Sequence, residues 1–114
     1  MKHQTPKRAA IERAIRKAKR EVKETRPEMC EGCGTCQGPI DMSHHIKVDY
    51  EGYKFAADPN NIAKMCRAKC HGHVEAGRYE LLDNGESIMA YIRHVAPEYL
   101  ERKLGRRDML KQQH

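Results

Sequence analysis

The segments Cys30-Glu31-Gly32-Cys33-Gly34 and Cys66-Arg67-Ala68-Lys69-Cys70-His71 stand on either side of the dipeptide His44-His45. Two thiolates in a Cys-x-x-Cys turn can bind one metal ion, and a second pair farther along the chain can complete a tetrahedral cage. Such a cage joins two distant parts of the chain. The arrangement therefore predicts a fold that is organised by a structural zinc ion.

The cysteines allow more than one set of zinc ligands. The first group contains a third thiol, Cys36, so Cys33/Cys36 competes with Cys30/Cys33, and the second pair has the spacing Cys-x-x-x-Cys. A total of five cysteines fits disulfide pairing poorly, and zinc is favoured over disulfides in a reducing compartment. The favoured zinc ligands are Cys30, Cys33, Cys66 and Cys70, with Cys36 as an alternate ligand or a spare thiol.

The composition describes a small domain that needs such a stabilising site. The chain has 114 residues, no Trp, a single Phe and 33% charged residues. It can bury only a modest apolar core, and its length fits one domain. No apolar run approaches the roughly 20 residues of a membrane span, and the basic N-terminus lacks the apolar stretch of a secretory signal. We therefore expect a cytoplasmic protein with no membrane partner.

Positive charge is concentrated near the N-terminus. Residues 1–26 contain ten Lys or Arg against three Glu, a surplus of +7, although the whole chain has a net charge of only +6. Such asymmetry indicates a polyanionic partner, for which nucleic acid is the usual candidate. A solvated helix that only keeps the protein soluble is the alternative. The predicted nucleic-acid-binding residues are Lys7, Arg8, Arg13, Arg16, Lys17, Lys19, Arg20 and Lys23.

The pattern of apolar residues predicts an α+β fold. Residues 6–25 have the spacing of an amphipathic helix that ends before Pro27. Residues 40–48 and 53–56 have strand composition and would form a hairpin. A helix is expected to follow somewhere within residues 62–76, closed by Gly77.

Two more helices are expected in the last third of the chain. Ser87 can cap the first, and Pro97 can start the second, which Gly105 would end. All segments are expected to pack into one compact domain. Its parts are a basic helical arm at residues 1–27, a cysteine and histidine core at residues 28–80, and a helical extension at residues 81–114.

Three histidines occupy positions from which they could act together. His44 and His45 are adjacent in a predicted strand, so their side chains face opposite ways and can serve different tasks. His71 directly follows a cage cysteine, so the zinc would hold it in place. One strand imidazole and His71 can bind a divalent cation with open coordination positions. The other strand imidazole stays free to accept a proton near neutral pH.

These motifs, in this order, resemble those of the HNH endonucleases, the ββα-metal nucleases, in the variant with a cysteine zinc cage. The resemblance covers roughly residues 29–76. It implies a ββα-metal core that is treble-clef-like at the zinc, and hydrolysis of DNA phosphodiester bonds. The chain is also similar to the small nucleases common in phage and prophage genomes, which implies a phage- or prophage-encoded protein inside a bacterial host. The residues that carry the resemblance are Cys30-Glu31-Gly32-Cys33-Gly34, His44-His45-Ile46, Asn61-Ile62, and Cys66 with Cys70-His71.

The resemblance also implies roles within the core. His45 matches the general base, and Asn61 matches the middle Asn that braces the loop and helps to orient the catalytic imidazole. His44 and His71 match the ligands of a catalytic divalent cation, which would be Mg²⁺, Mn²⁺, Ni²⁺ or Zn²⁺. Glu75, four residues after His71 on the same helical face, is either a further ligand or a surface carboxylate.

The expected reaction follows from phosphodiester chemistry. Hydrolysis needs an activated water, neutralisation of the charge that grows on the phosphorane, and stabilisation of the leaving 3′ oxygen. His45 would deprotonate the water, while the cation bound by His44 and His71 would contact a phosphate oxygen and the leaving oxygen. The expected partner is DNA and not a small-molecule substrate. Two other classes stay open: a non-catalytic zinc module that binds nucleic acid, and a protein-binding adaptor built on the zinc site.

Overall fold

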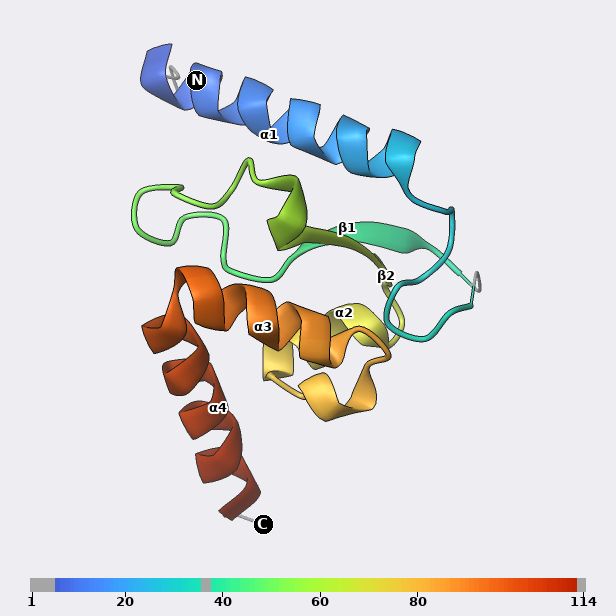
Figure 1. The fold of residues 1–114 in the computed structure, drawn as a ribbon, viewed down its shortest axis with the longest axis vertical. Coiled ribbons are helices and arrows are strands. Elements are labelled where there is room, and N and C mark those ends of the chain that lie inside the picture. The colour runs from blue at the N-terminus through green and yellow to red at the C-terminus, as the bar shows by residue number, and fades with distance from the viewer. Residues whose placement is uncertain (1–5, 36–37, 113–114) are drawn as a thin grey trace.

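Over residues 6–35 and 38–112, which the computed structural model describes, the chain forms four α-helices and a two-stranded sheet (Figure 1). This confirms the predicted α+β class. Two short 3₁₀ helices, η1 and η2, precede β2 and α3. The elements are α1 (Pro6–Thr25), β1 (Ile40–His44), η1 (Pro59–Asn61), β2 (Ile62–Cys66), α2 (Cys70–Ala76), η2 (Tyr79–Leu81), α3 (Gly85–Val95) and α4 (Pro97–Gln112).

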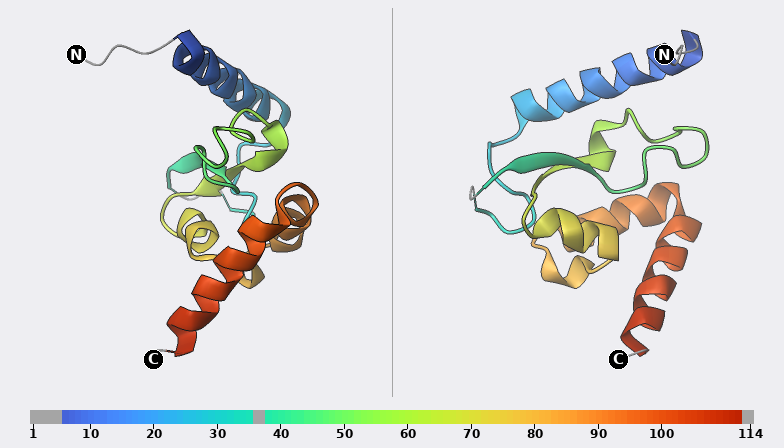
Figure 2. Two further views of the ribbon diagram at one scale, coloured as in Figure 1. Left: turned by 90° about the vertical axis from the view of Figure 1, so that its left-hand side faces the viewer. Right: turned by 180° about the vertical axis from the view of Figure 1, so that it is seen from behind.

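The sheet lies between two layers of helices. α1 covers one face, α2 and α3 lie on the other side, and α4 extends from the end of α3 (Figure 1, Figure 2). β1 and β2 are antiparallel, with Ile40 opposite Cys66 and His44 opposite Ile62. All five residues of β2 are buried, because helices cover both of its faces.

The predicted helix at residues 6–25 is confirmed as α1. Ala18 and Val22 of its apolar stripe are 4% and 1% exposed and pack on Ile62, with Met42 beside them. The helix ends before Pro27, because the residue that precedes a proline disfavours helical backbone. The C-terminal half of the basic arm is therefore packed against the sheet.

A buried lysine connects α1 to the sheet. The side chain of Lys64, in the middle of β2, is fully buried. Its Nζ donates to the carbonyls of Lys23 at 3.2 Å and Arg26 at 2.8 Å, and to the carboxylate of Glu28 at 3.1 Å. Carbonyls at a helix C-terminus lack partners within the helix and attract cations. Lys64 therefore caps α1 and holds its end over the strand.

The hairpin expected between residues 40–48 and 53–56 does not form. β1 ends at His44 and pairs with Ile62–Cys66, at the start of the range in which a helix is expected; the helix itself begins only at Cys70. Residues 48–57 form turns instead of a strand. A short apolar run fits a buried strand or a buried helix equally well by period alone, and burial from both faces decides for the strand.

Two boundaries differ in the C-terminal part of the chain. α3 begins at Gly85, ahead of Ser87, and α4 continues through Gly105 to Gln112. A glycine in an exposed helix costs only about 1 kcal/mol relative to alanine, so Gly105 does not stop α4. The helix expected within residues 62–76, with Gly77 as its end, is confirmed as α2: the φ of Gly77 is +73°, and its N–H donates to the carbonyls of His73 and Val74.

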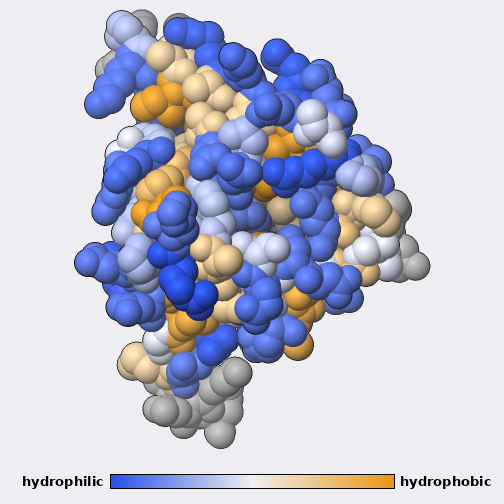
Figure 3. All heavy atoms as spheres, viewed as in Figure 1, coloured by the Kyte–Doolittle hydropathy of each residue, from blue (hydrophilic) through white to orange (hydrophobic). Residues whose placement is uncertain are grey.

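The surface seen in Figure 3 is mainly hydrophilic, with apolar residues in small patches between polar ones. None of the helices in residues 6–35 and 38–112 has the length and apolar content that crossing a membrane requires.

Lys64→Met should lower the free energy of unfolding by about 3 kcal/mol, because the partly buried carbonyls of Lys23 and Arg26 lose their charged donor. Lys54→Met is a matched control, since its side chain is 62% exposed. The control should change stability by less than about 0.5 kcal/mol. Urea unfolding of the zinc-loaded protein, followed by circular dichroism, measures both. Equal effects would show that Lys64 does not hold the end of α1.

Candidate functional site

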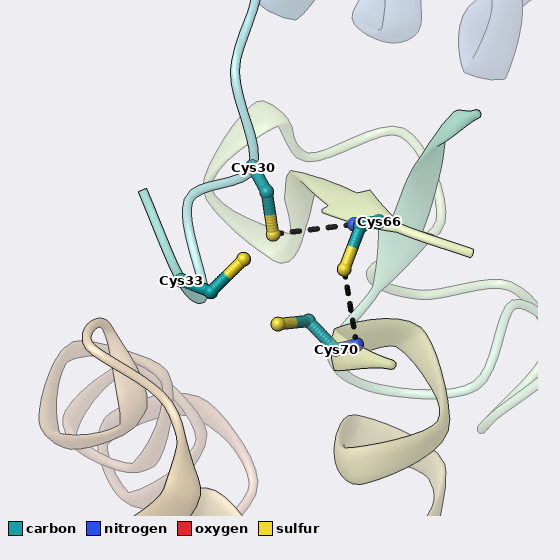
Figure 4. Close-up of side chains that lie close together, drawn as sticks. All are labelled: Cys30, Cys33, Cys66 and Cys70. Carbon is teal, nitrogen blue, oxygen red and sulfur yellow. Dashed lines mark hydrogen bonds between the residues drawn. The ribbon is translucent and has the colours of Figure 1, made fainter. Parts of the chain in front are cut away.

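Four cysteines from two distant segments converge at the junction of β2 and α2 (Figure 4). The Sγ atoms of Cys30, Cys33, Cys66 and Cys70 lie within 4.8 Å of one another, and all four are free thiols. Sulfurs at about 2.3 Å from a tetrahedral zinc ion stand roughly 3.8 Å apart, so the cluster fits this geometry. The four cysteines could therefore hold a structural metal ion such as zinc. Cys36 lies outside the described residues.

Backbone N–H groups point at the cage sulfurs. The Sγ of Cys30 accepts from the N–H of Gly32 at 3.3 Å and of Cys66 at 3.2 Å, and the Sγ of Cys66 accepts from Cys70 at 3.3 Å. Hydrogen bonding from Thr35 lowers the pKa of Cys33 to about 6, whereas burial raises the pKa of Cys70. Metals bind thiolates, so the donated N–H groups favour the metal-binding form.

Gly32 leaves the space that the cage needs. A Cβ at this position would stand 2.9 Å from the Cβ and Sγ of Cys70 and from the Cε of Met65. Any side chain here would displace Cys70. The glycine in the Cys-x-x-Cys turn is therefore required by close approach of the β2–α2 junction.

His44 and His71 line one pocket, which we call the large pocket. Its volume is about 840 Å³, and its walls come from β1, the loop after β1, α2 and α4, with Arg8 of α1 among its lining residues. Glu75, one turn after His71, lines it as well. The structure thus brings together three of the residues that the sequence analysis selects.

His71 lies between two carboxylates. Its Nδ1 is 3.2 Å from Oδ2 of Asp41, and its Nε2 is 3.1 Å from Oε1 of Glu75. Hydrogen bonds from Arg67 hold the pKa of the Asp41 carboxyl below its ordinary value. In the tautomer whose Nδ1–H donates to Asp41, the Nε2 lone pair would be on the side of Glu75. Two donors 3.1 Å apart can share a cation at about 2.1 Å from each, with Asp41 fixing the ring.

His44 forms its hydrogen bond through Nε2, whereas His71 contacts Asp41 through Nδ1. The Nε2–H of His44 donates to the carbonyl of Ala56 at 2.9 Å, so Nδ1 carries the lone pair. Burial lowers the pKa of His44, and the ring is therefore neutral at pH 7. In the part of the chain that the structure describes, His44 does not join His71 and Glu75 in a set of donor atoms within 4.8 Å. It shares their pocket without completing a three-residue ligand set.

His45 lies in a different pocket, which we call the small pocket. This pocket has a volume of about 360 Å³ and is lined by His45, Arg26, Asn84 and Tyr91 among others. The His45 ring is buried, and burial together with the charge of Arg26 lowers its pKa to about 4. The adjacent histidines thus face different pockets, as strand alternation predicts. The structure does not bring His45 together with His44 and His71.

Asn61 braces the loop between the two strands. Its buried side chain accepts the N–H of Ile46 at 2.8 Å and donates to the carbonyls of Ile46 at 3.1 Å and Phe55 at 3.2 Å. Phe55 precedes Ala56, whose carbonyl holds the His44 ring. Asn61 therefore orders the backbone that positions His44.

The predicted nucleic-acid-binding residues of α1 lie mostly on its exposed face. Arg8 and Lys19 are partly buried, and the Arg8 guanidinium lies 4.5 Å from the centroid of the Tyr53 ring. Arg8 also pairs with Glu12 at 3.4 Å. The exposed members are Lys7, Arg13, Arg16, Lys17, Arg20 and Lys23.

Sequence reasoning missed four residues of the large pocket region: Asp41, Lys47, Lys103 and Arg106. Asp41 reaches His71 only through the tertiary arrangement of β1 and α2. Lys103 and Arg106, three residues apart, lie on neighbouring turns of α4. Their spacing could have indicated that they share a helix face. The predicted helix end at Gly105 separated them, so this was missed.

Neither protein-family models, nor curated proteins, nor solved structures give a match to this chain. The resemblance to the HNH endonucleases therefore stays a prediction. The geometry itself provides a cysteine cage compatible with zinc and, next to it, a pocket with two histidines and a carboxylate.

Cys70→Ser should release the metal and unfold the domain, because a structural zinc contributes on the order of 10 kcal/mol to folding. We expect about one zinc per chain in the unmodified protein. Cys36→Ser should keep both metal and fold. Metal analysis and circular dichroism of the unmodified protein and of the Cys30→Ser, Cys36→Ser and Cys70→Ser variants test this. A Cys36→Ser protein without zinc, alongside a zinc-loaded Cys30→Ser protein, would assign the first ligand pair to Cys33/Cys36.

Proposed function

We propose that this protein is a metal-dependent endonuclease of the HNH type, which hydrolyses DNA phosphodiester bonds. The observation that carries the proposal is that His44, His71 and Glu75 line one pocket whose α2 wall starts at a cage cysteine. Phosphodiester hydrolysis needs a general base and a bound cation in one solvent-accessible place. This pocket contains an imidazole that could accept the proton and side chains that could ligate the cation.

In this proposal β1, β2 and α2 are a ββα-metal core. The antiparallel pairing of β1 and β2 supports it, as does the short connection of residues 67–69 between β2 and α2. Cys66 and Cys70 bracket this connection, so the cage holds α2 against the sheet. Asn61 closes the loop between the strands by three side-chain hydrogen bonds.

His71 and Glu75 are the proposed holders of the catalytic cation. Their facing nitrogen and oxygen are 3.1 Å apart, and Asp41 orients the imidazole from its other side. A divalent cation supplies charge neutralisation at the phosphate and at the leaving oxygen when it is bound. Glu75 is 73% exposed, so this side of the pocket is open to substrate.

The water-activating role goes to His44 in this proposal. The resemblance assigns that role to His45 and a ligand role to His44. His44 lines the large pocket and uses only Nε2 in its hydrogen bond to Ala56, whereas His45 is buried in the small pocket. The geometry therefore favours an exchange of roles within the dipeptide, with Asn61 as a positioning residue.

DNA is the proposed partner. The surplus of +7 over residues 1–26 and the exposed basic side chains of α1 support a polyanion, because phosphate contacts depend on positive charge rather than on base sequence. The same features support the rival class, a non-catalytic zinc module that binds nucleic acid. Cleavage separates the two classes.

His44→Gln should lower the cleavage of supercoiled plasmid in Mg²⁺, Mn²⁺ or Ni²⁺ by about two to four orders of magnitude, as expected for loss of a general base. His45→Gln is the matched control, since it makes the same change at the next residue. It should cut within about tenfold of the unmodified rate. His71→Gln should raise the cation concentration that half-maximal cleavage requires.

Circular dichroism and zinc content identify any variant that has lost its fold. A large loss in His45→Gln with none in His44→Gln would return the base role to His45. Unmodified rates in all three variants would reject the large pocket as the active site. DNA binding without cleavage in any of the cations would favour the non-catalytic module.

A further inference from the structure

The α4 wall of the large pocket is positively charged. Lys103 and Arg106 of α4 line the pocket, together with Lys47 from the loop after β1. α4 lies beside the end of α2, where a Cβ on Gly77 would stand 3.3 Å from Cγ of Lys103. Figure 2 shows α4 extending from the end of α3. The C-terminal helix thus reaches the same pocket as the β1 and α2 residues of the proposed active site.

Tyr99 connects the α4 cations to the loop. Its hydroxyl accepts the backbone N–H of Lys47 at 3.1 Å, and the Nζ of Lys103 lies 5.5 Å from the centroid of its ring. Tyr99 is itself buried. Tyr99 therefore fixes the backbone of Lys47 and contacts the partly buried side chain of Lys103.

Lys47, Lys103 and Arg106 differ from Arg107, their neighbour on α4, in their ion pairs. Arg107 donates to the carbonyl of Gly77 and to Glu80 at 3.2 and 3.1 Å. Among the described residues, no ion pair joins Lys47, Lys103 or Arg106 to a carboxylate. Arg107 is therefore a structural cation, whereas the other three are available to an anion.

The cations also repel one another. Burial and the nearby charges of Arg106 and Lys47 lower the pKa of Lys103, while the charge of Glu75 opposes this effect. Partly desolvated like charges are unfavourable together, and an anion between them relieves the repulsion. Such a cluster can bind an anion with several acceptor oxygens.

We propose that Lys47, Lys103 and Arg106 bind phosphate groups of the nucleic-acid strand that the large pocket cleaves, so that α4 is a second DNA-binding helix. The inference rests on the proposed function, because it uses the same pocket. Lys acts as a point charge and Arg as a planar fork toward phosphate oxygens. With Arg8 also lining the pocket, the strand would contact both α1 and α4. These contacts would position the strand for cleavage without reading its sequence.

The test measures binding of the zinc-loaded full chain to a labelled DNA oligonucleotide by fluorescence anisotropy, over a range of salt and without added divalent cation. Arg106→Gln and Lys103→Gln should each weaken binding by about tenfold at low salt. Each should also reduce the slope of log affinity against log salt by roughly 0.9 for duplex or 0.7 for single-stranded DNA. Arg102→Gln is the control, because it removes the same charge from an exposed site on α4 outside the pocket.

A loss in Arg102→Gln equal to that in Arg106→Gln, or no loss in either pocket variant, would overturn the inference. Because Arg106 is exposed, its variant stays informative if Lys103→Gln fails to fold.

Inorganic phosphate is the second probe. Phosphate binding that depends on Lys103 and Arg106, with unchanged oligonucleotide affinity, would point to a free-phosphate site and overturn the role of α4 in DNA binding. A protein that binds DNA through these residues but never cleaves it would refute the proposed nuclease and support the α4 site.

Discussion

The rest of the structure depends on four thiols held within 4.8 Å of one another. They hold the turn after α1 next to the junction of β2 and α2. These two segments are more than thirty residues apart in the chain. A two-stranded sheet is only marginally stable by itself, and a metal at this cage would supply the missing cohesion. The same constraint sets where α2 begins, and therefore where His71 stands. Closing the cage and building the large pocket are one structural event.

α1 combines two properties that the sequence presents as alternatives. Ala18 and Val22 cover the outer face of the sheet, and Lys64 caps the end of the helix from within β2. The opposite face of α1 remains exposed and basic. A charged helix can therefore be part of the core and still present cations to a partner, because a narrow apolar stripe suffices when a buried lysine fixes the helix end.

The large pocket collects features that are unfavourable by themselves. Tyr53, at its edge, has a φ of +68°, a left-handed conformation that is costly for a residue with a side chain. Lys103 stands partly buried among the like charges of Arg106 and Lys47. Such local conflicts persist where the surrounding structure enforces them, here through the Asn61 hydrogen bonds and the cage. Their concentration in one pocket is a reason to seek the function there.

Local spacing in the sequence determined the α+β class, the bounds of α1, the helix end at Gly77 and the opposite facing of the adjacent histidines. These features depend on the period of the backbone and on the few residues around them. Only the tertiary structure decided that Ile62–Cys66 is a strand, that Asp41 orients His71, and that α4 brings Lys103 and Arg106 to the pocket. Each of these results from burial or contact between segments far apart in the chain. No local pattern encodes them, because the free energy that selects them exists only once the segments pack together.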